Sequence, residues 1–223
     1  MKKIISLFLT AVLLCTVLVL TLTSCGACEY KNSRDVSGHE IVYVEMSVRG
    51  YGKMKILLDA TTAPKTVENF VKLTNSGFYD GLTFHRVIED FMIQGGDPMG
   101  NGMGGSSDTI TGEFSSNGFE NDISHLRGVI SMARSTDPDS ASSQFFICNA
   151  DSPHLDGNYA AFGYVVSGLD VVDKITSATL PYTPYYEYYG TPDYEMLKAY
   201  GYLSGAISNR SKQPVIEYVK VVD

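Results

Sequence analysis

Hydrophobic and polar positions alternate over much of this chain, in short runs that predict β-strands. The runs cover residues 40–48, 52–59, 82–88, 91–95, 128–133, 143–148, 160–166 and 215–222. They are rich in β-branched and aromatic residues, whose side chains pack well on a pleated surface. The first two runs flank Arg49-Gly50-Tyr51-Gly52, so they are predicted to pair as a hairpin.

Two segments show helical spacing instead. Pro64 opens the first of these segments. It stands in the first turn of the predicted helix, where a missing N–H costs nothing. Val67 and Phe70 follow three residues apart, and Gly77 ends the pattern. A second helix is predicted at about 169–178. Many short strands with two helices favour a single, mainly β domain built as a closed antiparallel barrel, because closure removes exposed strand edges.

Two of the predicted strands carry polar residues where a plain core strand would carry none. One runs Phe84-His85-Arg86-Val87-Ile88, and the other runs Ser143-Gln144-Phe145-Phe146-Ile147-Cys148. In period-two alternation Phe84, Arg86 and Ile88 share one face, and Gln144 and Phe146 share another. An arginine, glutamines and aromatic rings are therefore expected to converge on one apolar surface. Taken alone, Arg86 fits a solvated strand edge equally well.

The N-terminus has the pattern of a secretory signal. Met1-Lys2-Lys3 precedes an apolar stretch from Ile4 to Leu22, and small residues lead to Cys25. Leu-Thr-Ser-Cys resembles the bacterial lipobox, in which the cysteine receives lipid and becomes the mature N-terminus. We therefore predict a signal peptide at 1–24 and an extracytoplasmic protein anchored to the membrane by lipid at Cys25. The alternative is an uncleaved transmembrane anchor.

The composition of the remaining chain excludes some partners. Without residues 1–24 it keeps 15 basic and 25 acidic residues, a formal net charge of −10. It has no basic stretch, so nucleic acid is not an expected partner. An acidic protein gains nothing from an anionic membrane surface, so membrane attachment needs a covalent tether. Residues 25–38 are polar and aperiodic, which is typical of such a tether.

The cysteines and histidines give no pattern of a metal or redox site. Cys28 lies in the tether and Cys148 in a strand, which is weak evidence for a disulfide. The four histidines share no metal-ligand spacing. His85 is predicted to be a hydrogen-bonded core histidine. The glycine-rich stretch 100–105 lacks the following helix of a phosphate site, so we expect neither cofactor nor metal.

Several of these segments occur in a familiar order. FHRVI followed by FMIQGGD, a glycine-rich loop, GVISMA, SQFFI and LDGNYAAFG resembles the cyclophilin family of peptidyl-prolyl cis-trans isomerases. The resemblance runs from about Ile41 to Thr176 and resumes at about 214–222. It implies an isomerase domain at 39–223, folded as an eight-stranded barrel with a helix over each mouth. The implied substrates are unfolded or loop-exposed proline-containing polypeptides of exported proteins, and we expect a monomer.

The resemblance also implies roles for individual residues. Arg86 is the residue that hydrogen-bonds the imide nitrogen of the X-Pro bond. Gln94, with backbone groups of Ala133 and Arg134, holds peptide carbonyls, and Gln144 orients the peptide and Arg86. The proline socket consists of Phe91, Met92, Phe146 and Leu155. Its rim is formed by His154 and Tyr159, and Gly102 of the glycine-rich loop approaches the peptide.

Two features depart from the family. His154 and Tyr159 stand where tryptophan and histidine often lie, which puts strong cyclosporin binding in doubt but leaves Arg86 and the socket intact.

Residues of about 180–213 form an insertion in which eight of the fifteen tyrosines fall between Tyr182 and Tyr202. An amphipathic cover on the barrel is the favoured interpretation, and a peptide or glycan surface is the alternative. A proline-peptide binding module or chaperone with incidental turnover remains the alternative function.

Overall fold

The computed structural model describes residues 35–179 and 205–223. The predicted signal peptide, Cys25, most of the predicted tether and the tyrosine-rich stretch 180–204 lie outside the described residues. Within the described ranges, no helix is long and apolar enough to cross a membrane.

Eight strands and two α-helices form the described part of the chain, and each begins and ends within two residues of its predicted bounds. The strands are β1 (Ile41–Val48), β2 (Gly52–Asp59), β3 (Thr83–Ile88), β4 (Met92–Asp97), β5 (Val129–Met132), β6 (Phe145–Cys148), β7 (Ala161–Ser167) and β8 (Ile216–Val222). The helices are α2 (Pro64–Asn75) and α3 (Asp170–Thr179). Short 3-10 turns lie at Ser115–Asn117, Pro153–Leu155 and Arg210–Lys212.

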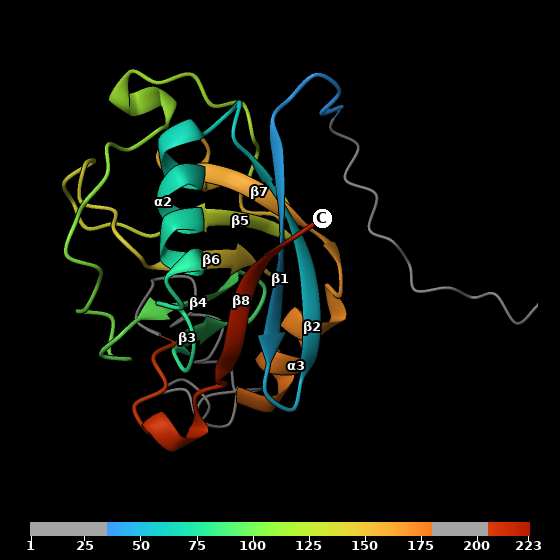
Figure 1. Cartoon of the computed structure of the whole chain (residues 1–223). Coiled ribbons are helices and arrows are strands. Elements are labelled where there is room, and N and C mark those ends of the chain that lie inside the picture. The colour runs from blue at the N-terminus through green and yellow to red at the C-terminus, as the bar shows by residue number, and fades with distance from the viewer. Residues whose placement is uncertain (1–34, 180–204) are drawn as a thin grey trace, which may run out of the picture. The chain divides into compact units, whose positions relative to one another are not determined.

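The strands form one antiparallel sheet in the order β3-β4-β6-β5-β7-β2-β1-β8, which curls around the core (Figure 1). Its two end strands approach each other only at their beginnings. The N–H of Phe84 donates to the carbonyl of Pro214 at 2.9 Å, and the N–H of Ile216 donates to the carbonyl of Leu82 at 2.8 Å. Thr83 and Val215 form an isolated bridge between these bonds.

The prediction of a closed barrel is therefore wrong, because β3 and β8 do not form a continuous ladder. Pro214 has no N–H to offer to β3. Further along β3 the outer edge is taken by residues 205–207, where Ala206 bridges Arg86 and the N–H of Ile207 donates to the carbonyl of His85. The sheet is a curled half-barrel, and residues 205–207 cover part of the outer edge of β3.

Aromatic rings fill the interior between the sheet and α2. Phe70 of α2 stacks on Tyr79 with ring centroids 4.8 Å apart, and both meet Phe145 of β6 edge-on at 5.6 Å. Phe162 of β7 lies 5.3 Å from Phe70. All four side chains are fully buried. This packing holds β6 against α2. The two neighbours of Phe145 in sequence, Gln144 just before β6 and Phe146 within it, are predicted site residues.

A buried carboxylate from a distant loop completes the start of α2. The N-cap residue Ala63 has no side chain to satisfy the first amides of the helix. Glu113, with no exposed surface, accepts hydrogen bonds from the N–H of Lys65 at 2.9 Å, the N–H of Thr66 at 2.8 Å and the hydroxyl of Thr66 at 2.7 Å. A negative charge is favourable at a helix N-terminus, so Glu113 fixes its loop to α2.

Glu113→Gln is expected to lower the free energy of unfolding by about 1–3 kcal/mol, because an amide presents an NH₂ group to donors and leaves buried N–H groups unsatisfied. Urea denaturation measures this change. Glu120→Gln, at an exposed position of the same segment, is the control and should change stability by less than about 0.5 kcal/mol. Equal stability of Glu113→Gln and wild type would contradict the capping role.

Candidate active site

Arg86 lies on β3 beside β4, with its side chain half-buried. The interpretation as a solvated edge residue is wrong, since the outer edge of β3 is covered at Ala206. The ladder between β3 and β4 shifts register between Phe84 and Arg86. This irregularity breaks the predicted alternation: Phe84 packs in the core against Phe145, whereas Arg86 faces a cavity on the other side of the sheet.

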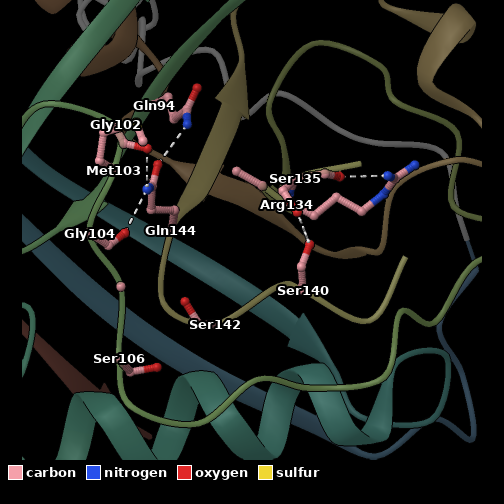
Figure 2. A pocket seen from close by; sticks show the side chains of 12 residues that line it. Gln94, Gly102, Met103, Gly104, Ser106, Arg134, Ser135, Ser140, Ser142 and Gln144 are labelled. Carbon is pink, nitrogen blue, oxygen red and sulfur yellow. Dashed lines mark hydrogen bonds between the residues drawn. The ribbon is translucent and has the colours of Figure 1, made fainter. Parts of the chain in front are cut away.

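A line of hydrogen bonds holds the Arg86 guanidinium. Its Nη1 donates to Oε1 of Gln94 at 3.1 Å, and Nε2 of Gln94 donates to Oε1 of Gln144 at 2.8 Å. Nε2 of Gln144 in turn donates to the carbonyls of Gly102 at 3.1 Å and Gly104 at 2.8 Å, as Figure 2 shows. Each amide uses both its oxygen and its nitrogen, so the line links Arg86 to the glycine-rich loop.

Burial is the main cause of a lowered Arg86 pKa, and the nearby Tyr159 opposes the shift. A guanidinium starts from so high a pKa that it stays protonated in proteins. Arg86 is therefore a fixed cation beside an apolar surface.

The glycine-rich loop is held from inside by a buried carboxylate. Asp97 accepts hydrogen bonds from the N–H groups of Met99, Asn101 and Gly102 at 2.8, 2.9 and 2.6 Å. Burial by itself would raise the Asp97 pKa, but these backbone bonds outweigh it and the pKa is lowered. A side chain at Gly104 would collide with Asp97. The amides of Met99, Asn101 and Gly102 are therefore already hydrogen-bonded within the chain.

A small cavity of about 140 Å³ opens beside Arg86. Its lining contains nine of the predicted residues: Arg86, Phe91, Met92, Gln94, Ala133, Arg134, Phe146, Leu155 and Tyr159. Phe146 forms part of this lining and is supported by the ring of His125, stacked at 6.0 Å, and by Tyr159, edge-on at 5.8 Å. Aromatic and aliphatic side chains share the lining with the polar groups of Arg86, Gln94 and Arg134, which suits a small ring attached to a polar backbone.

A second cavity of about 400 Å³ adjoins the first, because both are lined by Gln94, Ala133 and Arg134 (Figure 2). Gly102 and Gln144 belong to this larger cavity, as do residues that sequence reasoning missed: Met103, Gly104, Gly105, Ser106, Ser135, Ser140 and Ser142. The serines come from two loops more than twenty-five residues apart in sequence. The one sequence signal that could have identified these serines is the abundance of serine in the loops next to the predicted site strands.

The Arg134 side chain and the Ala133 N–H are both hydrogen-bonded within the chain. The Arg134 guanidinium donates to the carbonyl of Asn158 at 2.8 and 3.0 Å and lies 4.8 Å from the centre of the Tyr159 ring. The N–H of Ala133 donates to the carbonyl of Gln144 at 2.9 Å. The prediction that the Ala133 backbone holds a peptide carbonyl is therefore wrong for its N–H, which is already used within the chain.

Of two histidines near the groove, His85 differs from its predicted surroundings and His154 does not. His154 is exposed and lies 5.4 Å from the Phe91 ring, so it borders the groove without lining either cavity. His85 is buried as predicted, but neither ring nitrogen has a hydrogen-bond partner among the described residues. Its ring lies next to Gly102, which has no side chain to offer. Among residues 35–179 and 205–223, no group of His, Cys, Asp or Glu forms a metal site.

Comparison with known proteins identifies the family of this chain. Residues 43–187 match the family model described as cyclophilin type peptidyl-prolyl cis-trans isomerase/CLD. A peptidyl-prolyl cis-trans isomerase of Schizosaccharomyces pombe is 49% identical over 125 residues, which cover 56% of this chain and 79% of that protein. One from Helicobacter pylori is 47% identical over 126 residues, covering 56% and 74%.

Solved structures give the same result. The crystal structure of a Cryptosporidium parvum cyclophilin type isomerase, obtained in the presence of the dipeptide Ala-Pro, aligns with a TM-score of 0.64 and 27% identity. The alignment covers 81% of this chain and 99% of the parasite protein. The chain therefore belongs to the cyclophilin-type family of peptidyl-prolyl cis-trans isomerases, as its ordered sequence motifs predicted.

Proposed function

We propose that this isomerase accelerates rotation about X-Pro bonds through Arg86, with the small cavity beside it as its proline socket. The observation that carries the proposal is the position of Arg86, fixed by Gln94 at the edge of that cavity. The socket would hold the proline ring, and the guanidinium would then lie next to the imide nitrogen.

The chemistry of this reaction requires no nucleophile and no cofactor. Amide resonance creates the rotation barrier, about 18–20 kcal/mol in an ordinary peptide bond. In the twisted transition state the imide nitrogen leaves conjugation and gains a lone pair. A guanidinium N–H can donate to that lone pair only in the twisted state, so the bond lowers the barrier without tightening ground-state binding. A charge-assisted bond is worth about 1.5–3 kcal/mol.

The remaining stabilisation would come from fixing the peptide on both sides of proline. Phe146 and Leu155 hold the ring, while the larger cavity receives flanking residues near Gln144 and the carbonyl of Ala133. A proline-binding module or chaperone would need the socket but not a cation beside it. The three-residue line that orients Arg86 therefore favours catalysis over binding alone.

We further propose that the enzyme works outside the cytoplasm, as a monomer tethered by lipid at Cys25. The support is the charged and apolar N-terminal sequence ending in Leu-Thr-Ser-Cys. Its substrates would be exported polypeptides with unfolded or loop-exposed X-Pro segments, whose folding it assists.

Arg86→Ala is expected to lower kcat/KM roughly 10- to 150-fold, the equivalent of one charge-assisted hydrogen bond. Arg86→Lys keeps the charge but loses the planar fork, so it should recover only part of the rate. A protease-coupled assay on a proline-containing tetrapeptide measures both. Arg49→Ala, at an exposed arginine, is the control and should match wild type. Wild-type turnover in folded Arg86→Ala would refute the assigned role.

Cys25→Ala is expected to abolish incorporation of labelled fatty acid and to leave the protein unprocessed or released from the membrane, because acyl chains are the proposed tether. Labelling and cell fractionation measure this. Cys28→Ala is the matched control and should remain lipidated. A wild-type protein that carries no lipid and retains residues 1–24 would instead support the uncleaved anchor.

A further inference from the structure

The last residues of the predicted insertion, 205–213, bind directly to the strand that carries Arg86. We call this segment the strap. The N–H of Val87 donates to the carbonyl of Gly205 at 2.8 Å, and the N–H of Ile207 donates to the carbonyl of His85 at 2.8 Å. The side chain of Ile207 is buried in the core. Gly205 has φ +65°, and a Cβ there would lie 2.4 Å from the carbonyl oxygen of Val87, so the close approach depends on glycine.

Gln213 connects the strap to both β3 and the glycine-rich loop. Its side chain is buried, with 4% of its surface exposed. Nε2 donates to the carbonyls of Gly100 and Ile207, each at 2.8 Å, while Oε1 accepts a hydrogen bond from the hydroxyl of Thr83. Both ends of the amide are therefore used, which fixes its orientation.

Arg210 holds the same loop at the two residues before Gly100. Its Nη1 donates to the carbonyl of Met99 at 2.8 Å and its Nη2 to the carbonyl of Pro98 at 3.2 Å. The residue itself is exposed, so the contact is a planar, two-pronged clamp on the loop surface.

The loop is consequently fixed through its amides and its carbonyls by different parts of the chain. Asp97 binds the N–H groups of three loop residues, and the strap binds the carbonyls of Pro98, Met99 and Gly100. The next residues of the loop present the carbonyls of Gly102 and Gly104 to Gln144.

We propose that Arg210 and Gln213 are positioning residues for the isomerisation. By fixing the start of the loop they set the two carbonyls that orient Gln144, and Gln144 orients Arg86 through Gln94. The proposal rests on the function proposed above for Arg86. It assigns a catalytic support role to the last residues of the predicted insertion.

The test is a double-mutant cycle on the full chain. Arg210→Ala is expected to lower kcat/KM about three- to tenfold, within the range of couplings found in hydrogen-bond networks. In a Gln144→Ala background the same substitution should change kcat/KM less than about twofold, because the path to Arg86 is already broken. Arg210→Lys, which cannot form the two-pronged contact, should resemble Arg210→Ala, and Arg49→Ala should be neutral.

A second measurement separates positioning from a general loss of stability. The side-chain NH₂ signals of Gln144 in ¹⁵N NMR spectra should move in Arg210→Ala and in Gln213→Glu, which replaces the donating amide with a carboxylate. Additive effects of Arg210 and Gln144, wild-type kcat/KM in Arg210→Ala, or Gln144 signals that do not move would each overturn the proposal.

The two proposals fail in different ways. If Arg86→Ala is inactive and Arg210→Ala equals wild type, only the strap proposal is wrong. If folded Arg86→Ala retains full activity, the assigned mechanism is wrong, whatever the Gln144 signals report.

Discussion

The geometry of the groove in this isomerase depends on how the flexible side chain of Arg86 is fixed. An arginine side chain loses up to about 2 kcal/mol of rotamer freedom when it is fixed, so it needs partners that are themselves fixed. Gln94 and Gln144 meet that need because each amide is bonded at both ends. In a half-buried site such bonds are stronger than in water. The loop carbonyls that end the line therefore influence the orientation of Arg86.

Loops form much of the groove, and buried carboxylates give them their rigidity. Asp97 binds the glycine-rich loop, and Glu113 binds the start of α2. Asp59 binds the N–H groups of Thr61 and Thr62 after β2. In each case a charge that is costly to bury is balanced by several backbone donors. Of these three carboxylates, Asp97 holds a loop that lines the larger cavity, and none of them lines either cavity itself.

The incomplete closure of the sheet and the position of the strap are linked. An unpaired strand edge is a site for unwanted pairing with other chains, and β3 is an end strand of the sheet. Residues 205–207 cover that edge where β8 does not. The same residues bring Arg210 and Gln213 to the loop. Edge protection and groove geometry are thus supplied by the same segment.

Local patterns in the sequence determined the elements and the identity of the main groove residues. Strand and helix bounds follow from periodicity over a few residues, and the ordered motifs placed Arg86, Gln94 and Phe146 in one groove. Tertiary structure alone decided the rest. The irregularity beside His85 separated Phe84 from Arg86, and Glu113 reached a helix 47 residues away to cap it. The serine-lined cavity and the incomplete closure by β8 also join distant segments. Short-range periodicity carries no information on such contacts, because they depend on how the whole sheet curls.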